Sequence, residues 1–305
     1  MKFINPPRSN NTLRTTYVVG SGVGSQNRAA YRALLRRSSN NAQGKPCCSL
    51  VNIPVNIPVN IPVNIDIASI ATLFGFLYKL NANYTITEFQ VLTIPSGYGL
   101  VISSGHTFTN QGTIVVNGIV QNIGSIITNS GSITVNTGGI LYNFISGIIY
   151  NSGSITVNVN GTISNYSSGS MYNTNSGSIT INGILYNTNN GKIYNSDLIT
   201  VNGYLHNSNG NIYNSDLITV NTGGILYNNN NGNIYNSDSI TVNGIINNTN
   251  NSNIYNSDSI TINVNGTINN ESGSTISNTG SGTFNNNGTF NNYGTFNDDN
   301  IPGST

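Results

Sequence analysis

The second half of the chain is built from a short repeat, and this repeat restricts the folds open to the sequence. Each unit carries three short segments in which apolar and polar residues alternate, and Gly or Asn pairs separate the segments. Such alternation is typical of β-strands joined by turns. A period of about 20–22 residues is typical of a solenoid. The units begin after recurring tyrosines, at Asn151, Asn173, Asn195, Asn214, Asn236 and Asn256.

Three strands per unit are too short to bury a core alone, so we expect successive units to stack in parallel register. The predicted fold is all-β: a parallel β-helix, or β-solenoid, with about three short strands per 20–22-residue coil. The irregular spacing of the units favours a right-handed coil. Stacked Asn side chains at the turns should hydrogen-bond along the stack. The predicted interior columns contain Ile133, Val135, Ile179, Ile181, Ile199, Val201, Ile218, Val220, Ile240 and Val242.

Composition agrees with a repeat fold. Only 6% of the 305 residues are charged, and 36% are hydrophobic. Ordinary disorder requires a high net charge, which this chain lacks. Low charge with abundant Asn, Ser, Thr and Gly leaves a prion-like low-complexity chain or a repeat protein. The regular strand-and-turn pattern favours the repeat protein.

The charges are unevenly distributed along the chain. Eight of the ten Lys and Arg residues lie before residue 49, with no acidic residue among them, whereas the remainder is mildly acidic. We therefore expect a basic arm that binds an acidic partner surface. No module that reads a nucleic-acid sequence is visible, so nucleic acid is not the expected partner. A segment with helical spacing, residues 27–37, contributes Arg28, Arg32, Arg36 and Arg37 to this arm.

Changes in composition divide the chain into five predicted regions. Prolines at every fourth position exclude helix and central strand from the second region, so it is an extended spacer. Phe284, Phe290 and Phe296, six residues apart, indicate a final cap. The regions are a basic anchoring arm with a short helix (1–50), a Pro-repeat spacer (51–65), an N-terminal cap or lead-in (66–105), the β-helix repeats (106–277) and a Phe-repeat C-terminal cap (278–305).

No cleavable signal peptide or transmembrane segment is expected. No apolar stretch follows Lys2, and the most apolar run, residues 67–80, is too short to span a bilayer. The adjacent pair Cys47 and Cys48 is the chain's whole cysteine content. Adjacent cysteines rarely bridge each other, so this pair is interpreted as a surface pair or an intermolecular crosslink.

A column of aspartates recurs in four successive "NSD" turns, and earlier units have Gly131 and Gly153 at that place. Stacked carboxylates repel each other, so they must extend into solvent, raise their pKa values or hold a cation such as Ca²⁺. Three interpretations are open. The pattern favours structural turn residues most, a cation site next and catalytic carboxylates least. Catalysis is disfavoured because an active site usually interrupts a repeat. The column contains Asp197, Asp216, Asp238 and Asp258.

A tyrosine column precedes the same turns. The Ile beside each Tyr has the stronger preference for the interior, so the rings should face outward. Outward rings could form a platform for sugars, or they could simply stiffen the sheet. The column contains Tyr150, Tyr172, Tyr194, Tyr213, Tyr235 and Tyr255, and a shorter set contains Tyr142, Tyr186, Tyr227 and His206.

The body resembles Asn- and Gly-rich β-helix proteins that occur as adhesin-like and fibre-like surface components of bacteria and large DNA viruses. The resemblance rests on "LTIPSGYGL" leading into "GTIVVNG", "GSITVN" and "GTINN" units, from about residue 92 to residue 297. The arm, "NRAAYRALLRRSSNNAQGKPCC", resembles leader segments of proteins from giant viruses. The resemblance implies a fibre, spike or filament subunit and transfers no catalytic residue.

Together these features predict a structural surface protein rather than an enzyme. The expected molecule is a stiff rod in a virion or an extracellular surface assembly, attached or polymerised through its arm and self-associating. The alternatives are a glycan-binding adhesin that uses the Tyr columns and binds host glycans, and a carbohydrate-active β-helix enzyme. No cofactor is expected, apart from Ca²⁺ if the Asp column holds a cation.

Overall fold

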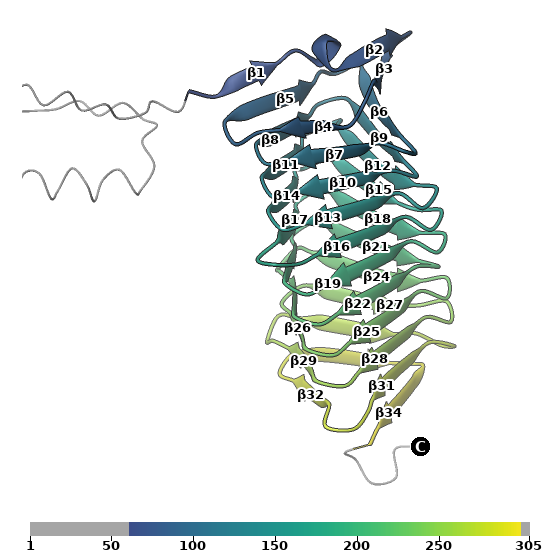
Figure 1. The fold of residues 1–305 in the computed structure, drawn as a ribbon. Helices are drawn as coiled ribbons and strands as arrows, with labels where there is room; N and C mark the ends of the chain where they lie inside the picture. The colour runs from purple at the N-terminus through teal and green to yellow at the C-terminus, as the bar shows by residue number, and fades with distance from the viewer. Residues whose placement is uncertain (1–60, 300–305) are drawn as a thin grey trace, which may run out of the picture. The chain divides into compact units, whose positions relative to one another are not determined.

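The computed structural model describes residues 61–299, and these residues form a stack of short parallel strands (Figure 1). Each coil contributes one strand to each of three sheets, which hold 11, 12 and 11 strands. Within the described part, the one helical element is the 3₁₀ turn η1 (Ile67–Ser69), capped by the Asp66 side chain. The residues predicted to form the arm and most of the Pro-repeat spacer lie outside the described residues.

The strands fall into three sheets. Sheet A holds β1 (Val63–Ile65), β5 (Gln90–Ile94), β8 (Thr113–Val116), β11 (Ser132–Val135), β14 (Ser154–Val157), β17 (Ser178–Ile181), β20 (Leu198–Val201), β23 (Leu217–Val220), β26 (Ser239–Val242), β29 (Ser259–Ile262) and β32 (Thr283–Asn286). Sheet B holds β2 (Ala71–Phe74), β3 (Leu77–Leu80), β6 (Gly99–Ser103), β9 (Ile119–Ile123), β12 (Ile140–Phe144), β15 (Thr162–Asn165), β18 (Ile184–Thr188), β21 (Tyr204–Ser208), β24 (Ile225–Asn229), β27 (Ile245–Asn248), β30 (Thr267–Asn270) and β33 (Thr289–Asn292). Sheet C holds β4 (Tyr84–Ile86), β7 (Thr107–Asn110), β10 (Ile126–Asn129), β13 (Ile148–Asn151), β16 (Ser170–Asn173), β19 (Lys192–Asn195), β22 (Asn211–Asn214), β25 (Asn233–Asn236), β28 (Asn253–Asn256), β31 (Thr275–Asn278) and β34 (Thr295–Asp298).

The register places equivalent residues of successive units directly above one another. In sheet C, Tyr150 pairs with Tyr172, and in sheet A, Thr156 pairs with Thr180. Every coil-to-coil pairing is parallel, and the hairpin of β2 and β3 is antiparallel. The predicted all-β parallel β-solenoid with three short strands per coil is therefore confirmed. The right-handed sense stays a prediction.

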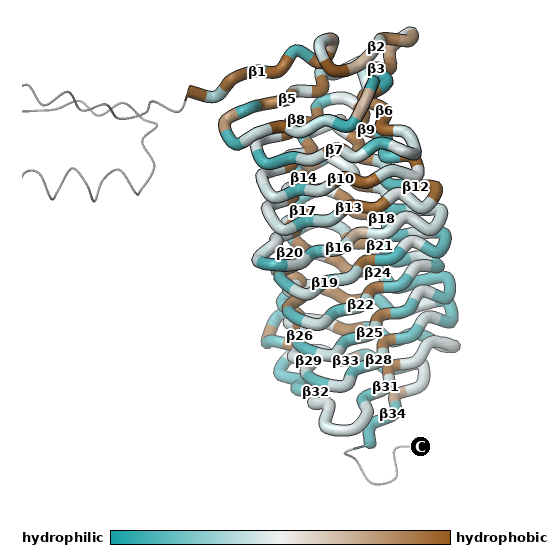
Figure 2. The backbone as a smooth tube through the Cα atoms, in the orientation of Figure 1, coloured by the Kyte–Doolittle hydropathy of each residue, from teal (hydrophilic) through white to brown (hydrophobic). Residues whose placement is uncertain are grey.

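The core follows from the period-two alternation of each strand. The inward residues of sheet A are two aliphatic side chains per strand, such as Ile199 and Val201, which are both fully buried. All ten residues predicted for the interior columns are buried. Figure 2 shows apolar residues recurring at the same place in successive coils.

Sheets B and C differ from sheet A because each of their strands from β9 to β31 buries one apolar residue and one Asn. In the β18 strand these are Leu185 and Asn187, and both have no exposed surface. Seventeen Asn side chains are buried in the described residues. A buried amide must be hydrogen-bonded, because leaving one donor or acceptor unpaired costs about 1–3 kcal/mol.

Stacking satisfies these amides. The Oδ1 of Asn187 accepts from Asn165 Nδ2 at 2.7 Å, and Asn187 Nδ2 donates to Asn207 Oδ1 at 2.7 Å. Asn187 Nδ2 also donates to the backbone carbonyl of Asn211 at 3.1 Å. Since a carbonyl oxygen can only accept, this bond fixes which side of the amide is nitrogen. The predicted Asn stacking is thus confirmed.

Two such Asn ladders run through the stack, one in sheet B and one in sheet C. Their Nδ2 groups all donate toward the C-terminal coils. The sheet B ladder contains Asn122, Asn143, Asn165, Asn187, Asn207, Asn228, Asn248, Asn270 and Asn292. The sheet C ladder contains Asn110, Asn129, Asn151, Asn173, Asn195, Asn214, Asn236, Asn256 and Asn278, and it ends on Asp298.

Because every ladder Nδ2 group donates toward the C-terminal coils, the first Asn of each ladder has no Asn before it to donate to its Oδ1 atom. The Oδ1 atoms of Asn110 and Asn122 are buried and accept no hydrogen bond. The residues paired with them in the preceding strands are Ile86 and Ile102, which cannot donate. Each ladder therefore begins with a buried, unsatisfied acceptor. This lowers the stability of the fold once per ladder.

Turns between the sheets require left-handed backbone, and Asn provides it. In the turn after β18, Asn189 and Asn190 have φ values of 48° and 64°. Asn tolerates this region better than most non-glycine residues because its short polar side chain can hydrogen-bond locally. The same pair recurs at Asn230 and Asn231. Asn therefore serves both the buried ladders and the exposed turns.

The ends of the stack differ from its middle. Parallel pairing reaches back to β1 in sheet A, β3 in sheet B and β4 in sheet C, and β3 pairs with β2 in an antiparallel hairpin. At the other end, each sheet contributes one phenylalanine to a half-buried triad. The ring centroids of Phe284, Phe290 and Phe296 are 4.8–5.1 Å apart.

The ladder makes a testable prediction. Replacing Asn187→Ala should lower the free energy of unfolding by roughly 2–5 kcal/mol, because Asn207 Oδ1 and the Asn211 carbonyl lose their buried donor. The matched control is Asn202→Ala. Asn202 makes the same type of Asn–Asn bond, to Asn182, but it is exposed, so its loss should cost less than about 1 kcal/mol. Equal losses in guanidinium unfolding would contradict the buried-ladder account.

Candidate functional site

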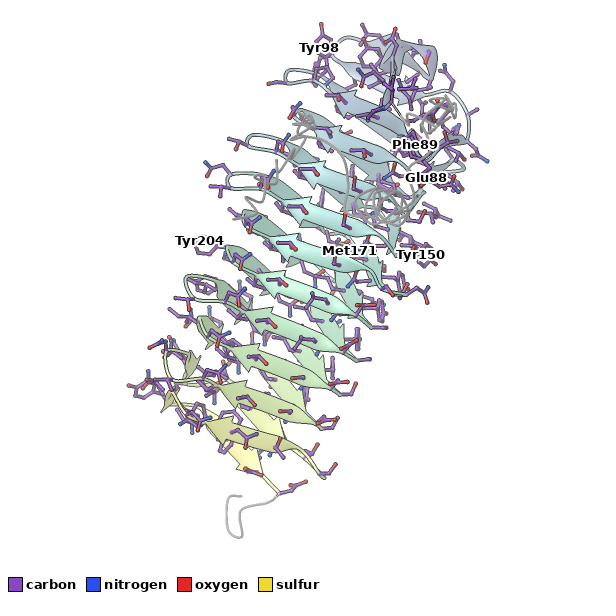
Figure 3. The ribbon with its side chains drawn as sticks, turned by 90° about the vertical axis from the view of Figure 1, so that its left-hand side faces the viewer. Glu88, Phe89, Tyr98, Tyr150, Met171 and Tyr204 are labelled. Atoms are coloured by element: carbon purple, nitrogen blue, oxygen red, sulfur yellow. The ribbon has the colours of Figure 1, made fainter. Side chains whose placement is uncertain are left out.

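The three outward faces of the stack carry different side chains. Sheet A presents Ser and Thr, as in β11 and β14, and sheet C presents the Tyr column beside polar residues. Sheet B presents aliphatic and aromatic residues, as in β12 and β18. Figure 3 shows Tyr204 of sheet B and Tyr150 of sheet C projecting on opposite sides of the stack.

The Tyr column of sheet C is a continuous ring stack. Consecutive ring centroids lie 4.6–5.1 Å apart, and the planes of neighbouring rings differ by 5–25°. The inward partners, among them Ile193 and Ile212, are fully buried, so the predicted outward direction of the Tyr side chains is correct. The rings are half-buried to exposed, with Tyr150 40% exposed.

This geometry limits what the column can bind. A sugar stacks on the face of an aromatic ring, and here each inner ring has both faces covered by its neighbours. For an inner ring, the ring edge is then what remains available to a ligand. The residues paired with the terminal rings are Thr128, beyond Tyr150, and Ser277, beyond Tyr255. The column is thus a row of ring edges that ends at a small polar residue on each side.

The phenols of Tyr172, Tyr194 and Tyr235 stay neutral at physiological pH, because the pKa of each is raised. Burial raises the pKa of Tyr172, and the neighbouring Tyr194 and Tyr150 raise it further. Burial also raises the pKa of Tyr235, with further contributions from Tyr213 and Tyr255. Neutral phenols can donate and accept hydrogen bonds, but they carry no charge to attract an ion.

Sheet B holds a second, mixed aromatic column. Its rings include Tyr186, His206 and Tyr227, with centroid distances of 5.2 and 4.7 Å on the two sides of the imidazole. Beside it, Phe144 and Tyr166 stack at 5.1 Å with an interplanar angle of 4°. Burial between these rings lowers the pKa of His206.

The Asp column occupies the position expected from the sequence. Each Asp immediately precedes a sheet A strand, and Gly112, Gly131, Gly153 and Gly177 hold that place in the earlier coils. Asp216, Asp238 and Asp258 are exposed, and Asp197 is half-buried. Within residues 61–299, the carboxylates of these four residues make no hydrogen bond.

In these turns the backbone carbonyls of the Asp column, and not its carboxylates, accept hydrogen bonds. Asn214 Nδ2 donates to the Asp216 carbonyl at 2.6 Å, and the Ser239 backbone N–H donates to it at 3.1 Å. The Asp side chain is therefore not what holds the turn. In the described part of the chain, no three His, Cys, Asp or Glu side chains lie together as metal ligands, and the cation hypothesis stays a prediction.

A shallow polar groove crosses the turns that follow sheet A. It has a volume of about 750 Å³, and the short turn at Asn243 lies between the longer turns that carry Thr222 and Val264. Its lining is mostly Asn side chains, without a charged residue. Such a lining can hydrogen-bond a neutral polar molecule, but it offers neither an acid–base pair nor a nucleophile with a base.

The predicted arm residues, Arg28, Arg32, Arg36, Arg37, Cys47 and Cys48, lie outside the described residues. Across residues 61–299, no helix has the length and apolar character needed to cross a membrane. The aliphatic column on the outward face of sheet B was not predicted from the sequence. The signal was present in the apolar residue that opens each "ILYN"-type segment, such as Ile184 and Ile225.

The exposed Asp column makes a second prediction. Asp216→Asn with Asp238→Asn should leave Tm unchanged within about 2 °C, or raise it slightly at low salt, because the carboxylates repel each other and hold no partner. The measurement is thermal unfolding with and without Ca²⁺. A Ca²⁺-dependent rise in Tm that the wild type shows and the double variant loses would instead establish a cation ladder.

His206 makes a third prediction, on pH dependence. Because burial lowers its folded-state pKa, protonation favours the unfolded chain. The contribution of neutral His206 to folded-state stability is complete above the unfolded-state pKa of about 6.5. It is lost as the pH falls below that value. The Tm decrease between pH about 7.5 and 5.5 should therefore be smaller in His206→Tyr than in the wild type. Identical decreases would show that the imidazole is not desolvated.

Neither a family model nor a curated protein matches the sequence. Among solved structures, the chain is similar to the crystal structure of a TibC-catalyzed hyper-glycosylated TibA55-350 fragment. The identity is 20%, the match covers 76% of this chain and 95% of that chain, and the TM-score is 0.29. This degree of likeness carries no argument about activity. The strand pairing, the ladders and the faces described above are what any functional conclusion must use.

Proposed function

We propose that this protein is a structural surface subunit whose β-helical body is a stiff rod and whose basic N-terminal arm attaches it. The observation that carries the proposal is the continuity of the two buried Asn ladders through successive coils. Each ladder ties every coil to the next by side chains as well as by backbone. Bending the stack would break several buried hydrogen bonds at once, so the body resists bending.

Regularity supports a mechanical role over a catalytic one. Active sites usually break the pattern of the fold that carries them, by placing unlike side chains together. Here the outward residues repeat from coil to coil, and the carboxylates of the Asp column stand in equivalent turns with no basic partner among the described residues. We therefore propose a protein without chemistry of its own and without a required cofactor.

The arm supplies the attachment in this proposal. Its eight positive charges precede a body that carries the chain's nine acidic residues. A basic arm fits an acidic partner surface or the acidic body of another copy. The setting that suits such a rod is a virion or an extracellular surface, where a crosslink through Cys47 or Cys48 could join subunits.

Negative-stain microscopy of the purified full-length chain tests this proposal. We expect straight rods about 50 Å long, because each sheet has about 11 strands spaced ~4.8 Å apart. These rods should occur in assemblies or bound to an acidic surface. Charge reversal of Arg28, Arg32, Arg36 and Arg37 to Glu should abolish attachment and leave Tm unchanged. The matched control reverses Lys79 and Lys192, in the body.

Two results would contradict the proposal. Flexible or globular particles would show that the body is not a rod. Attachment that survives reversal of the arm charges, or that is lost equally in the Lys79 and Lys192 control, would show that the arm is not the attachment element.

A further inference from the structure

The outward face of sheet B, from β9 to β27, is uncharged and largely apolar, with polar interruptions such as Ser164, and no described residue covers it. Its first column is mainly aliphatic, with half-buried Ile side chains where a solvent-facing strand position would ordinarily be polar. Register places these residues directly above one another. The first column contains Ile119, Ile140, Thr162, Ile184, Tyr204, Ile225 and Ile245.

A second column runs beside the first on the same face, two residues further along each strand. It contains Tyr142, Tyr186, His206 and Tyr227, and the remaining coils have Gln121, Ser164 and Asn247 in the same column. The rings of Tyr186, His206 and Tyr227 are half-buried and contact one another. In the coils where the second column is aromatic, the apolar surface is therefore about two side chains wide. The polar groups of these two columns there are hydroxyl groups and one imidazole.

Charge is absent from this face over seven coils. The outward residues of β9, β12, β15, β18, β21, β24 and β27 include no Lys, Arg, Asp or Glu. By contrast, sheet C carries Lys192 and the turns before sheet A carry the Asp column. Two such faces can meet without desolvating a charge, which would otherwise oppose association.

We propose that this B face is the surface through which two copies of the chain pair side by side. The inference rests on the proposed structural role and names the partner: a second copy related by a two-fold axis, with its own B face. Apolar sheet faces pack at a separation of about 10 Å with interdigitated side chains. A two-fold contact needs one self-complementary patch, and alternating Ile and Tyr columns provide it.

The size of the face fits a weak, reversible pair. Seven strands spaced ~4.8 Å apart and two to three outward positions per strand give on the order of 500 Å² on each copy. Two copies then bury about 1,000 Å², which is the lower limit for a specific interface. A patch of this size is comparable to the largest apolar patch on a typical monomer, and such patches are often functional. Pairing should therefore depend on concentration.

Charge distribution selects the antiparallel arrangement. Seven of the chain's nine acidic residues lie between Asp197 and Asp299, in the C-terminal coils. Parallel pairing would place these like charges side by side, whereas antiparallel pairing keeps them apart. Added salt should therefore reduce the preference for the antiparallel arrangement.

Sedimentation equilibrium of the full-length chain under reducing conditions tests the inference. We expect a monomer–dimer equilibrium in the wild type, and at least tenfold weaker association for Ile184→Asp with Ile225→Asp. The matched control, Thr180→Asp with Thr219→Asp, places the same charges in the same two coils on sheet A and should pair as the wild type does. A milder variant, Ile184→Thr with Ile225→Thr, uses the residue that the column itself has at Thr162, so it keeps the fold while removing apolar surface.

Several outcomes would overturn the inference. One is a wild type that stays monomeric at the highest concentration, and another is association by the threonine variant equal to that of the wild type. Equal loss in the sheet A control would also overturn it, because the effect would then not belong to the B face. Straight single rods in the microscope together with monomeric sedimentation would remove the pairing alone and leave the proposed rod function intact.

Discussion

The buried amide is the constraint on which the rest of this structure depends. An Asn enclosed in a solenoid interior is tolerated only if its Oδ1 and Nδ2 groups find partners, and an identical Asn one coil away supplies them. The sequence must then repeat with little change, because a coil without Asn at that place leaves its neighbours unpaired. Repetition is therefore a requirement of the hydrogen bonding as well as a consequence of the stacking.

The same constraint explains why the three outward faces carry different side chains. The inward positions are fixed by aliphatic columns and Asn ladders, so variation is confined to outward positions and turns. Sheet A uses Ser and Thr there, sheet C stacks tyrosines, and sheet B exposes aliphatic and aromatic columns. Because ring stacks cover their own faces, the sheet C column offers little ring face to a sugar, and sheet B carries the larger apolar surface.

Periodicity alone was enough to predict the solenoid, the inward aliphatic columns, the outward tyrosines and the stacking of Asn, because each depends on residue spacing. The direction of the Asn ladders could not be predicted, since Oδ1 and Nδ2 are equivalent in a sequence. It depends on which coil supplies a backbone carbonyl, as Asn211 does for Asn187. The ring stacking that covers the faces of Tyr172 and Tyr194 could not be predicted either, because side-chain rotation, not register, determines it.

Hydrogen exchange of the Asn side chains tests the central claim most directly. Side-chain amide exchange followed by nuclear magnetic resonance distinguishes an Nδ2 group held inside the stack from one at the surface. The account predicts slow exchange, over hours or longer, for the seventeen buried Asn side chains, and exchange within minutes for exposed ones such as Asn202. Uniformly fast exchange of all Asn side chains would contradict it, because the ladders could not then be the interaction that holds the coils together.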